Sequence, residues 1–341
     1  MVRRMMQNEA RTTTEPAKAL ALISGGLDSA LATALLIRQD IEVEGVFFSS
    51  PFCQCNRKGG CQAIDIAKAL NIKLKIITKD EEYIEVVRRP RHGYGKGMNP
   101  CIDCRIFMLK RAKEYAKKIG ASFLVTGEVL GERPMSQHRR ALEVIERESG
   151  LKGLILRPLS ARLLPETKVE KNLVDRNKLL DISGRSRKRQ IELAEEFKIT
   201  GYACPAGGCL LTDKNFARRL KDLFKTKEKI TMRDVELLKV GRHFRYGPSK
   251  IIVGRNEEEN TKLLSLKRKS DHYFEVPECG SPITVLQDNG SEETIRLAAS
   301  LTSYYSDCES DPCPVTYGKT KLDHTINAPK ISEEQVNRLR I

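Results

Sequence analysis

The 341-residue chain has 60 lysines and arginines against 45 aspartates and glutamates, which gives a formal net charge of +15. Its hydrophobic content of 40% is enough for packed cores, so the composition excludes a wholly disordered chain. The positive surplus favours an anionic partner, usually a nucleic acid, although a merely basic surface is an equally weighted alternative.

No stretch of the sequence approaches the roughly 20 apolar residues that a membrane-spanning helix needs, so no membrane contact is expected. Residues 1–18 are polar and basic, lack the apolar core of a signal peptide, and are expected to form a flexible tail. A cytoplasmic location is the default expectation. The ten cysteines should then be reduced, which favours metal ligands or reactive thiols over disulfides.

Apolar strands alternate with helices over the first part of the chain. Strands are predicted at 19–23, 42–48, 73–77, 122–126 and 154–156, and helices at 30–38, 62–70, 102–119, 137–147 and 185–197. The segment 88–92, which is followed by three glycines, is predicted to be a mobile loop. The alternation is typical of a parallel sheet covered on both faces, with ligands bound beyond the carboxyl ends of the strands. We therefore predict an α/β domain over residues 19–211.

The pattern changes after Cys209. Helices are predicted at 213–224, 232–238, 257–264 and 292–304, and short strands at 243–246, 250–253, 272–276 and 283–286. Helices and short strands in this order predict a smaller α+β domain over residues 212–341.

A glycine-rich segment with the sequence Ser-Gly-Gly-Leu-Asp-Ser, residues 24–29, joins the first strand to the first helix. Glycines allow a sharp turn, and the free amides at a helix start bind phosphate. Asp28 offers a carboxylate for a magnesium ion. The segment lacks the Gly-Lys-Ser/Thr ending of a Walker A loop, and an ordinary helix cap is the alternative interpretation.

This segment resembles the PP-loop signature of N-type ATP pyrophosphatases, which split ATP into AMP and pyrophosphate. The resemblance implies a Rossmann-like parallel sheet of the PP-loop/HUP type. It also implies ATP bound by Ser24, Gly25, Gly26, Leu27, Asp28 and Ser29, with Mg²⁺ as a cofactor and Asp28 as a catalytic residue.

Three further cues occur in order: Gly127-Glu128-Val129-Leu130-Gly131, Ser136-Gln137 and Arg157-Pro158-Leu159. Together they resemble the catalytic domain of tRNA 4-thiouridine synthase (ThiI). The resemblance implies that Gly127, Glu128 and Gln137 lie near the nucleotide and that Ser136 approaches the nucleotide or the target base. No THUMP-like or rhodanese region is recognisable in this chain, so the target nucleotide and the sulfur donor stay open.

Four cysteines form two pairs, Cys101 with Cys104 and Cys204 with Cys209. Cys101 and Cys104 are three residues apart at a predicted helix start, so they share a face there. Together with Cys204 or Cys209 they would supply three ligands to a 4Fe–4S cluster with one open iron. That arrangement resembles cluster-dependent tRNA thiolation enzymes.

Other roles compete with the cluster. All four cysteines would suit a structural zinc ion. Alternatively Cys104 or Cys204 would carry a catalytic persulfide, and inert buried thiols are the remaining alternative. Cys53, Cys55 and Cys61 form a candidate second metal site without an evident fourth ligand, whereas Cys279, Cys308 and Cys313 show no convincing ligand spacing.

Basic residues cluster at two places that suit RNA. Arg185, Arg187 and Lys188 lie at a predicted helix start, where positive charge opposes the dipole unless phosphate neutralises it. Segments at 241–245 and 252–260 resemble the NFACT-type RNA-binding domain, which implies phosphate contacts by Arg242, Arg245 and Arg255. A solvated charged surface is the alternative for the first cluster.

Together these features predict an ATP-dependent tRNA thiolation enzyme, favouring a 4-thiouridine product. The expected partners are tRNA and a sulfur donor, either sulfide or the persulfide of a cysteine desulfurase, and a homodimer is one assembly that the sequence allows. The alternatives are a different PP-loop adenylating ligase of the amidotransferase type, and an RNA-binding factor with an inactive ATP domain.

Overall fold

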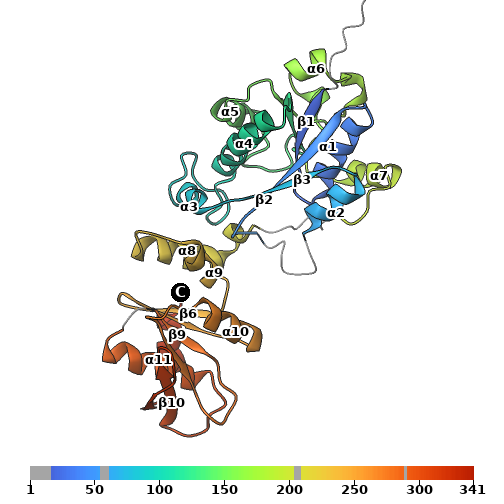
Figure 1. The fold of residues 1–341 in the computed structure, drawn as a ribbon. Coiled ribbons are helices and arrows are strands. Elements are labelled where there is room, and N and C mark those ends of the chain that lie inside the picture. The colour runs from blue at the N-terminus through green and yellow to red at the C-terminus, as the bar shows by residue number, and fades with distance from the viewer. Residues whose placement is uncertain (1–16, 54–60, 203–208, 288–289) are drawn as a thin grey trace, which may run out of the picture. The chain divides into compact units, whose positions relative to one another are not determined.

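The computed structural model describes residues 17–53, 61–202, 209–287 and 290–341, which form two compact units (Figure 1). The first unit contains the chain up to Lys79 together with Arg89–Gly95 and Pro100–Gly208. The second contains Asp80–Arg88, Lys96–Asn99 and Cys209–Ile341. In the described segments, no helix is both long and apolar enough to span a bilayer.

The first unit is built on a five-stranded parallel sheet with the order β3-β2-β1-β4-β5. Its strands are β1 (Lys18–Leu22), β2 (Glu42–Ser49), β3 (Leu74–Thr78), β4 (Phe123–Thr126) and β5 (Ile155–Leu156). Its helices are α1 (Leu27–Ile37), α2 (Gln62–Ala69), α4 (Cys101–Lys118), α5 (Arg139–Ser149), α6 (Lys168–Asn172) and α7 (Lys188–Glu196), with 3₁₀ turns η1 (Ala161–Leu163) and η2 (Arg176–Lys178). The predicted Rossmann-like sheet is confirmed.

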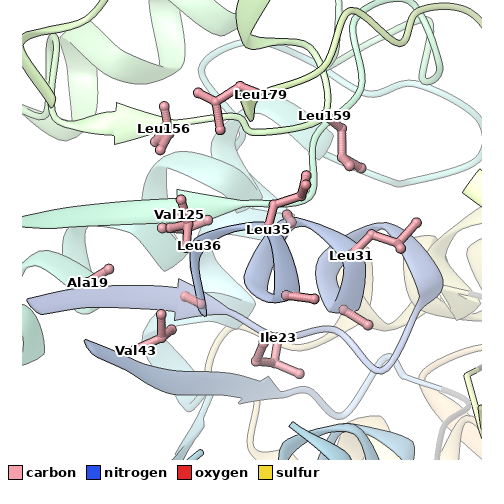
Figure 2. Packing of buried hydrophobic residues seen from close by; sticks show 14 of the residues in the cluster. Ala19, Ile23, Leu31, Leu35, Leu36, Val43, Val125, Leu156, Leu159 and Leu179 are labelled. Carbon is pink, nitrogen blue, oxygen red and sulfur yellow. The ribbon is translucent and has the colours of Figure 1, made fainter. Parts of the chain in front are cut away.

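Alternate residues of the strands pack into two hydrophobic clusters, one on each face of the sheet. Ala19, Ala21 and Val125 pack with α1 and α7, whereas Leu20, Leu22 and Leu124 pack with α4 and α5. Figure 2 shows Leu31, Leu35 and Leu36 of α1 within the first cluster. This two-sided burial explains why the strands read as continuous apolar runs.

Two predictions in the first two hundred residues were wrong in detail. The helix predicted at 185–197 begins only at Lys188. Leu130 and Ser183 form a parallel β-bridge, Gly184 N donates 2.7 Å to Leu130 O, and Gly184 has φ of +81°, so the chain bends before the helix begins. The predicted loop at 88–92 is partly helical, since Arg88 ends helix α3 (Glu81–Arg88). The Asp103 carboxylate accepts hydrogen bonds of 3.0 Å from the backbone N–H groups of Arg91 and His92.

The second unit is a six-stranded antiparallel sheet with the order β11-β10-β8-β9-β7-β6. The strands are β6 (Arg242–Tyr246), β7 (Ser249–Val253), β8 (His272–Glu275), β9 (Thr284–Leu286), β10 (Cys313–Gly318) and β11 (His324–Ala328). The helices are α8 (Lys214–Thr226), α9 (Met232–Leu237), α10 (Glu257–Leu266), α11 (Glu292–Tyr304) and α12 (Glu333–Leu339), with a 3₁₀ turn η3 (Leu210–Thr212). A separate α+β fold is therefore confirmed, whereas the predicted boundary at residue 211 stays a prediction.

Helices cover both faces of this antiparallel sheet. Phe244, Ile251 and Phe274 pack with Ala298 of α11 and Val336 of α12, and the alternate strand residues pack with α9 and α10. Helix α3 also belongs to this unit, although it lies far earlier in the sequence. The Arg88 guanidinium donates to the carbonyl oxygens of Phe224 and Glu228 at the end of α8, at 3.2 and 2.6 Å.

Candidate active site

The phosphate-loop candidate lies at the carboxyl edge of the parallel sheet. Residues 24–29 follow β1, and Gly127 follows the adjacent strand β4. The strand order reverses between β1 and β4, because β2 and β3 lie on one side of β1 and β4 and β5 on the other. Such a switch point leaves a crevice outside the strand ends, which is where ligands of doubly wound sheets bind.

Two serines fix the shape of the loop. Ser24 N donates to Ser29 Oγ at 3.1 Å, and Ser29 Oγ donates to Gly26 O at 2.8 Å. Gly26 is the N-cap of α1 and supplies no side-chain cap. The first backbone N–H groups of α1 therefore remain available to an anion, where the helix dipole also favours negative charge.

Close backbone packing explains two of the glycines. Gly25 has φ of +79°, which favours glycine, and a Cβ there would lie 3.0 Å from the Ala63 backbone nitrogen at the start of α2. A Cβ on Gly127 would lie 2.4 Å from Ser29 N and 2.6 Å from Asp28 O. Gly127 is thus next to the loop, where the sequence placed it, and it sets the separation between the end of β4 and the start of α1.

Asp28 is partly buried in the first turn of α1, beside the segment that leads into α7. Arg187 donates to Asp28 Oδ2 at 3.1 Å. Burial raises the pKa of the Asp28 carboxyl, and the charge of Arg187 offsets only part of this effect. Asp28 Oδ1 and Arg187 Nε are buried and have no hydrogen-bond partner among the described residues. These spare polar atoms fit a missing ligand, since buried polar groups are normally satisfied.

Sequence reasoning missed two residues near Asp28. The Gln190 side chain is fully buried beside Asp28 and lowers the pKa of that carboxyl, yet neither atom of its amide makes a well-formed hydrogen bond in the described parts of the chain. Burial and the negative charge of Asp28 raise the pKa of Glu132. A signal for Gln190 was present, because it lies three and four residues before the buried pair Leu193 and Ala194 on one helix face. Arg187, predicted to bind RNA, lies at the phosphate loop instead of on an open surface.

Glu128, predicted to lie near the nucleotide, is at the centre of a buried ion-pair network. Its side chain is 1% exposed and accepts from Arg157 Nε at 2.9 Å, while Arg105 Nε lies 3.4 Å from the other oxygen. Arg157 also pairs with Glu146. Although burial raises the pKa of Glu128, Arg157 and Arg105 outweigh this effect and hold it below its ordinary value. Glu128 is therefore ionised, and its ion pairs with Arg157 and Arg105 stabilise the interior of the first unit.

Gln137 and Ser160 shape the loop that follows β4. Gln137 Oε1 accepts from Arg133 N at 3.1 Å, and Gly131 N donates to Gln137 O at 2.7 Å. The buried Ser160 hydroxyl accepts from Leu130 N at 2.9 Å and donates to Ile182 O at 2.6 Å. These bonds join the loop after β4 to the segment that leads into α7, where Arg187 pairs with Asp28.

Cys104 lies at the same edge of the sheet as the phosphate loop. Lys79, directly after β3, donates from its backbone to Ser49 O at the end of β2, and its Nζ lies 3.2 Å from Cys104 Sγ. The neighbouring residue Arg105 is paired with Glu128, which directly follows Gly127. A short chain of contacts therefore links the Cys104 segment to the phosphate loop.

Three of the four cysteines predicted to bind a metal, Cys101, Cys104 and Cys209, lie among the described residues. Cys101 and Cys104 begin α4, where the helix N-terminus favours thiolates. Cys204 and Cys55 lie outside the described residues, and Cys209 belongs to the second unit. Among the described residues, no three His, Cys, Asp or Glu side chains come together as metal ligands. The cluster therefore stays a prediction.

The arginines predicted to bind RNA already have partners within the second unit. Arg245 donates to both oxygens of Asp222, at 3.0 and 2.6 Å, and Arg255 pairs with Glu259. Arg242 donates to Gly254 O at 3.0 Å, and its guanidinium lies 4.5 Å from the ring centre of Tyr305. Of the cluster before α7, Arg185 and Lys188 flank Arg187, and their RNA role stays a prediction.

A basic cleft that sequence reasoning missed lies at the turn between β10 and β11. It has a volume of about 480 Å³ and is lined by His272, Gly318, Lys319, Thr320, Lys321, Asp323 and His324. The Tyr317 ring lies 6.2 Å from His272 and 5.2 Å from His324, measured between ring centres. Aromatic rings beside lysines are the combination that single-stranded nucleic acid recognises.

Two family models match separate parts of the chain. Residues 14–163 match the family model described as thiamine biosynthesis protein (ThiI). Residues 241–340 match the model described as NFACT protein RNA binding domain. The first part of the chain is thus similar to ThiI and its last hundred residues to the NFACT-type RNA-binding domain. Arg187 and Gln190 lie after the end of the matched ThiI segment.

Relatives of the ThiI segment are tRNA-thiolating proteins by name. A probable tRNA sulfurtransferase of Thermoanaerobacter sp. (strain X514) is 32% identical over 120 residues, covering 34% of this chain and 30% of the relative. A tRNA-specific 2-thiouridylase MnmA of Leptospira biflexa is 33% identical over 128 residues, covering 33% of this chain and 34% of the relative. The chain thus spans about a third of the length of these curated relatives.

A solved 4-thiouridine synthetase in complex with RNA and bound ATP aligns with a TM-score of 0.37 and 21% identity. The alignment covers 65% of this chain and 52% of that one.

Proposed function

We propose that this protein is an ATP-dependent tRNA sulfurtransferase that adenylates a uridine carbonyl oxygen and replaces it with sulfur, releasing AMP and pyrophosphate. A 4-thiouridine-type product is favoured by the ThiI match of residues 14–163. The 2-thiouridylases among the relatives make position 2 of uracil the alternative.

One observation carries the proposal: a phosphate loop and a thiol pair at the same edge of the sheet. Gly127 contacts the loop, Glu128 follows it, and Arg105 connects Glu128 to the helix that begins with Cys101 and Cys104. Adenylation needs the first feature and sulfur transfer needs the second. An ammonia-using ligase would have no use for thiols there.

In the first step, the uridine oxygen attacks the α-phosphorus of ATP and the bond to pyrophosphate breaks. The loop amides and the start of α1 would hold the leaving pyrophosphate. Arg187 would exchange part of its contact with Asp28 for phosphate oxygens, and the buried Gln190 amide would turn from Asp28 to the nucleotide. Asp28 is the residue that would hold Mg²⁺, which when bound neutralises phosphate charge.

In the second step, a sulfur nucleophile adds to the activated uracil carbon and AMP leaves with the former carbonyl oxygen. With sulfide as the donor, loss of the sulfur-bound proton gives the thiocarbonyl product. With a Cys104 persulfide, the terminal sulfur bonds to carbon. Cys101 then attacks Cys104 Sγ, forming a disulfide and releasing the thiocarbonyl. Both routes balance without a further reactant within one turnover.

A 4Fe–4S cluster on Cys101, Cys104 and either Cys204 or Cys209 remains the proposed cofactor, with zinc and persulfide carriage as alternatives. The i, i+3 spacing at the start of α4 supports paired ligands. When bound with one open iron, the cluster would hold a sulfide. Iron, zinc and acid-labile sulfide analysis of anaerobically purified protein separates the three alternatives.

The NFACT-type domain would dock the tRNA, which fits the net charge of +15. A cytoplasmic location follows for an enzyme acting on tRNA. Sulfide or a desulfurase persulfide would supply the sulfur, and a homodimer stays an untested expectation.

The first test is mass spectrometry of nucleosides from tRNA incubated anaerobically with the protein, ATP, Mg²⁺ and sulfide. We expect a thionucleoside that appears only with ATP, and its identity distinguishes 4-thiouridine from 2-thiouridine. Absence of any thionucleoside, with sulfide and a persulfide-loaded desulfurase both supplied, would reject the proposal. AMP formation without sulfur incorporation would favour a different adenylating ligase. No AMP with any tRNA would favour an RNA-binding factor.

A further inference from the structure

Three cysteines without a metal-like sequence spacing converge in the second unit. Cys313 begins β10 and is completely buried, and Cys279 and Cys308 pack against the hydrophobic cluster that contains it. Cys279 lies in the connection between β8 and β9, and Cys308 follows α11. The two loops are joined because Asp307 N donates to Gly280 O at 2.8 Å. Long-range folding, not sequence spacing, therefore brings these thiols together.

Cys308 and Cys313 differ in access and in acidity. The two thiols interact with each other, and the Ser310 hydroxyl lies 3.1 Å from Cys308 Sγ. These contacts hold the pKa of the partly exposed Cys308 below its ordinary value. Burial, and then the hydrogen bond to Cys308, raises the pKa of Cys313 to about 11.

Neighbouring groups also affect the acidity of the Cys308 and Cys313 thiols. Lys330 donates from Nζ to Glu309 O at 3.2 Å, which keeps a positive charge beside the Cys308 loop. The buried Ser303 hydroxyl has no hydrogen-bond partner within ordinary geometry in the described chain, and it lowers the pKa of the nearby Cys313 thiol. It would stabilise charge on Cys313 once Cys308 is no longer negative. Thiol–disulfide exchange needs this arrangement: an accessible thiolate that attacks and a protected thiol that resolves.

We propose that Cys308 and Cys313 form a redox-active dithiol of the NFACT-type domain that reacts with small disulfides. This site is separate from the proposed thiolation chemistry and does not depend on it. Cys308 is assigned as the attacking residue and Cys313 as the resolving residue, while Cys279 packs beside them without taking part.

The reaction balances with a small disulfide as the oxidant. The Cys308 thiolate attacks one sulfur, forms a mixed disulfide and releases one thiolate. Cys313 then loses its proton and attacks Cys308 Sγ, which forms the protein disulfide and releases the second thiolate. The two thiols lose two electrons and the small disulfide gains them.

Glutathione disulfide is the probe for the test, applied to the full chain under native, anaerobic conditions, followed by acid quench and alkylation. Cleavage after glutamate places each cysteine on its own fragment, at residues 279–292, 294–309 and 310–333. We expect the fragments 294–309 and 310–333 to remain linked until reduction. Failure of Cys308 to react, or a link between 279–292 and 294–309, would overturn the proposal.

Variants assign the two roles. Cys313→Ala should accumulate the glutathione mixed disulfide on Cys308, because the resolving thiol is gone. Cys308→Ala should leave Cys313 as a free thiol, and Cys279→Ala, the matched control, should keep the 308–313 link. If Cys279→Ala loses the link, the assignment is wrong. Thermal unfolding checks each variant, and the wild-type fragment map decides alone if Cys313→Ala does not fold.

Discussion

Gly127 and Ser29 approach so closely that a Cβ on Gly127 would stand 2.4 Å from the Ser29 backbone nitrogen. The neighbouring atoms are all backbone, so they cannot swing aside as a flexible side chain would. The end of β4 therefore fixes the position of the first turn of α1. Any side chain at residue 127 must displace the phosphate loop.

Gly127→Ala should weaken ATP binding at least about tenfold and destabilise the fold by about 1–3 kcal/mol, the usual cost of overpacking. Titration calorimetry with ATP and thermal unfolding measure the two effects. Gly120→Ala is the control, because φ of +70° strains alanine there although a Cβ would meet nothing within 4 Å. It should lose about 1 kcal/mol and keep its ATP affinity. Equal ATP affinities for the two variants would contradict the role of Gly127.

Asp28→Asn should abolish pyrophosphate release and yet stabilise the folded protein at neutral pH. The reason is that burial raises the folded-state pKa of Asp28 above its ordinary 3.8, so ionised Asp28 destabilises the fold. The gain should be complete above the raised folded pKa and should vanish as the pH falls to 3.8. Chemical denaturation of both proteins across this pH range shows whether the substitution raises or lowers the free energy of unfolding. A less stable variant at pH 7 would refute the argument.

Glu128→Gln should destabilise the protein by about 3 kcal/mol, because Arg157 loses one of its buried partners. The folded-state pKa of Glu128 is held below its ordinary 4.5. The advantage of the wild type should therefore be complete above pH 4.5 and shrink as the pH falls toward the lower folded pKa. Glu148→Gln, which loses a partly exposed pair with His92, is the control and should cost less than about 1 kcal/mol. Similar losses in both variants would show that burial does not strengthen the Glu128 network.

Cys104→Ser should stop thionucleoside formation and leave pyrophosphate release close to that of the wild type, because the loop does not include the thiol. Cys279→Ser is the matched control, since Cys279 lies in the connection between β8 and β9 and takes no part in the proposed thiolation chemistry. Both products are measured in one reaction, one by nucleoside mass spectrometry and one by a pyrophosphate assay. Full sulfur transfer by Cys104→Ser would remove this residue from the mechanism.

Lys321→Glu should weaken tRNA binding and flatten its dependence on salt, because the exposed Lys321 lines the basic cleft. Lys262→Glu on α10 makes the same change of charge away from the cleft and should leave the salt slope nearly unchanged. Arg245→Glu tests the prediction that this residue of β6 contacts RNA. Because the change also breaks the ion pair with Asp222 and can unfold part of the sample, tRNA binding is expressed per folded molecule. If tRNA binding by Lys321→Glu and Lys262→Glu depended equally on salt concentration, the cleft would be excluded as the surface that contacts tRNA.

Local sequence signals predicted the parallel sheet and the phosphate loop well, because both depend on short apolar runs and on glycines. The predicted strand at 42–48 and helix at 62–70 differ from β2 and α2 by one residue at their ends. Helix α3 was missed, since its mean composition is polar and only Tyr83, Ile84 and Val87 are buried. Strands β10 and β11 and helix α12 were not predicted either, because the sequence between 305 and 341 has no strong apolar run.

Pairings between distant residues could not be predicted. The sequence shows Arg187 only as part of a basic run, and nothing in that run indicates that its partner is Asp28, 159 residues earlier. Glu128 likewise belongs to a segment that suggested nucleotide contact, whereas Arg157 and Arg105 enclose it. These assignments depend on which charges the fold buries together.

The Arg88 hydrogen bonds to the end of α8 have a consequence for modularity. The carbonyl oxygens of Phe224 and Glu228 are capped by a side chain contributed more than 130 positions earlier. Expression of residues 209–341 alone would leave that helix end without its guanidinium, so a single cut cannot release an intact C-terminal module. A fusion of this module to another protein would have to include α3, or supply another cation to the exposed carbonyl groups at the end of α8.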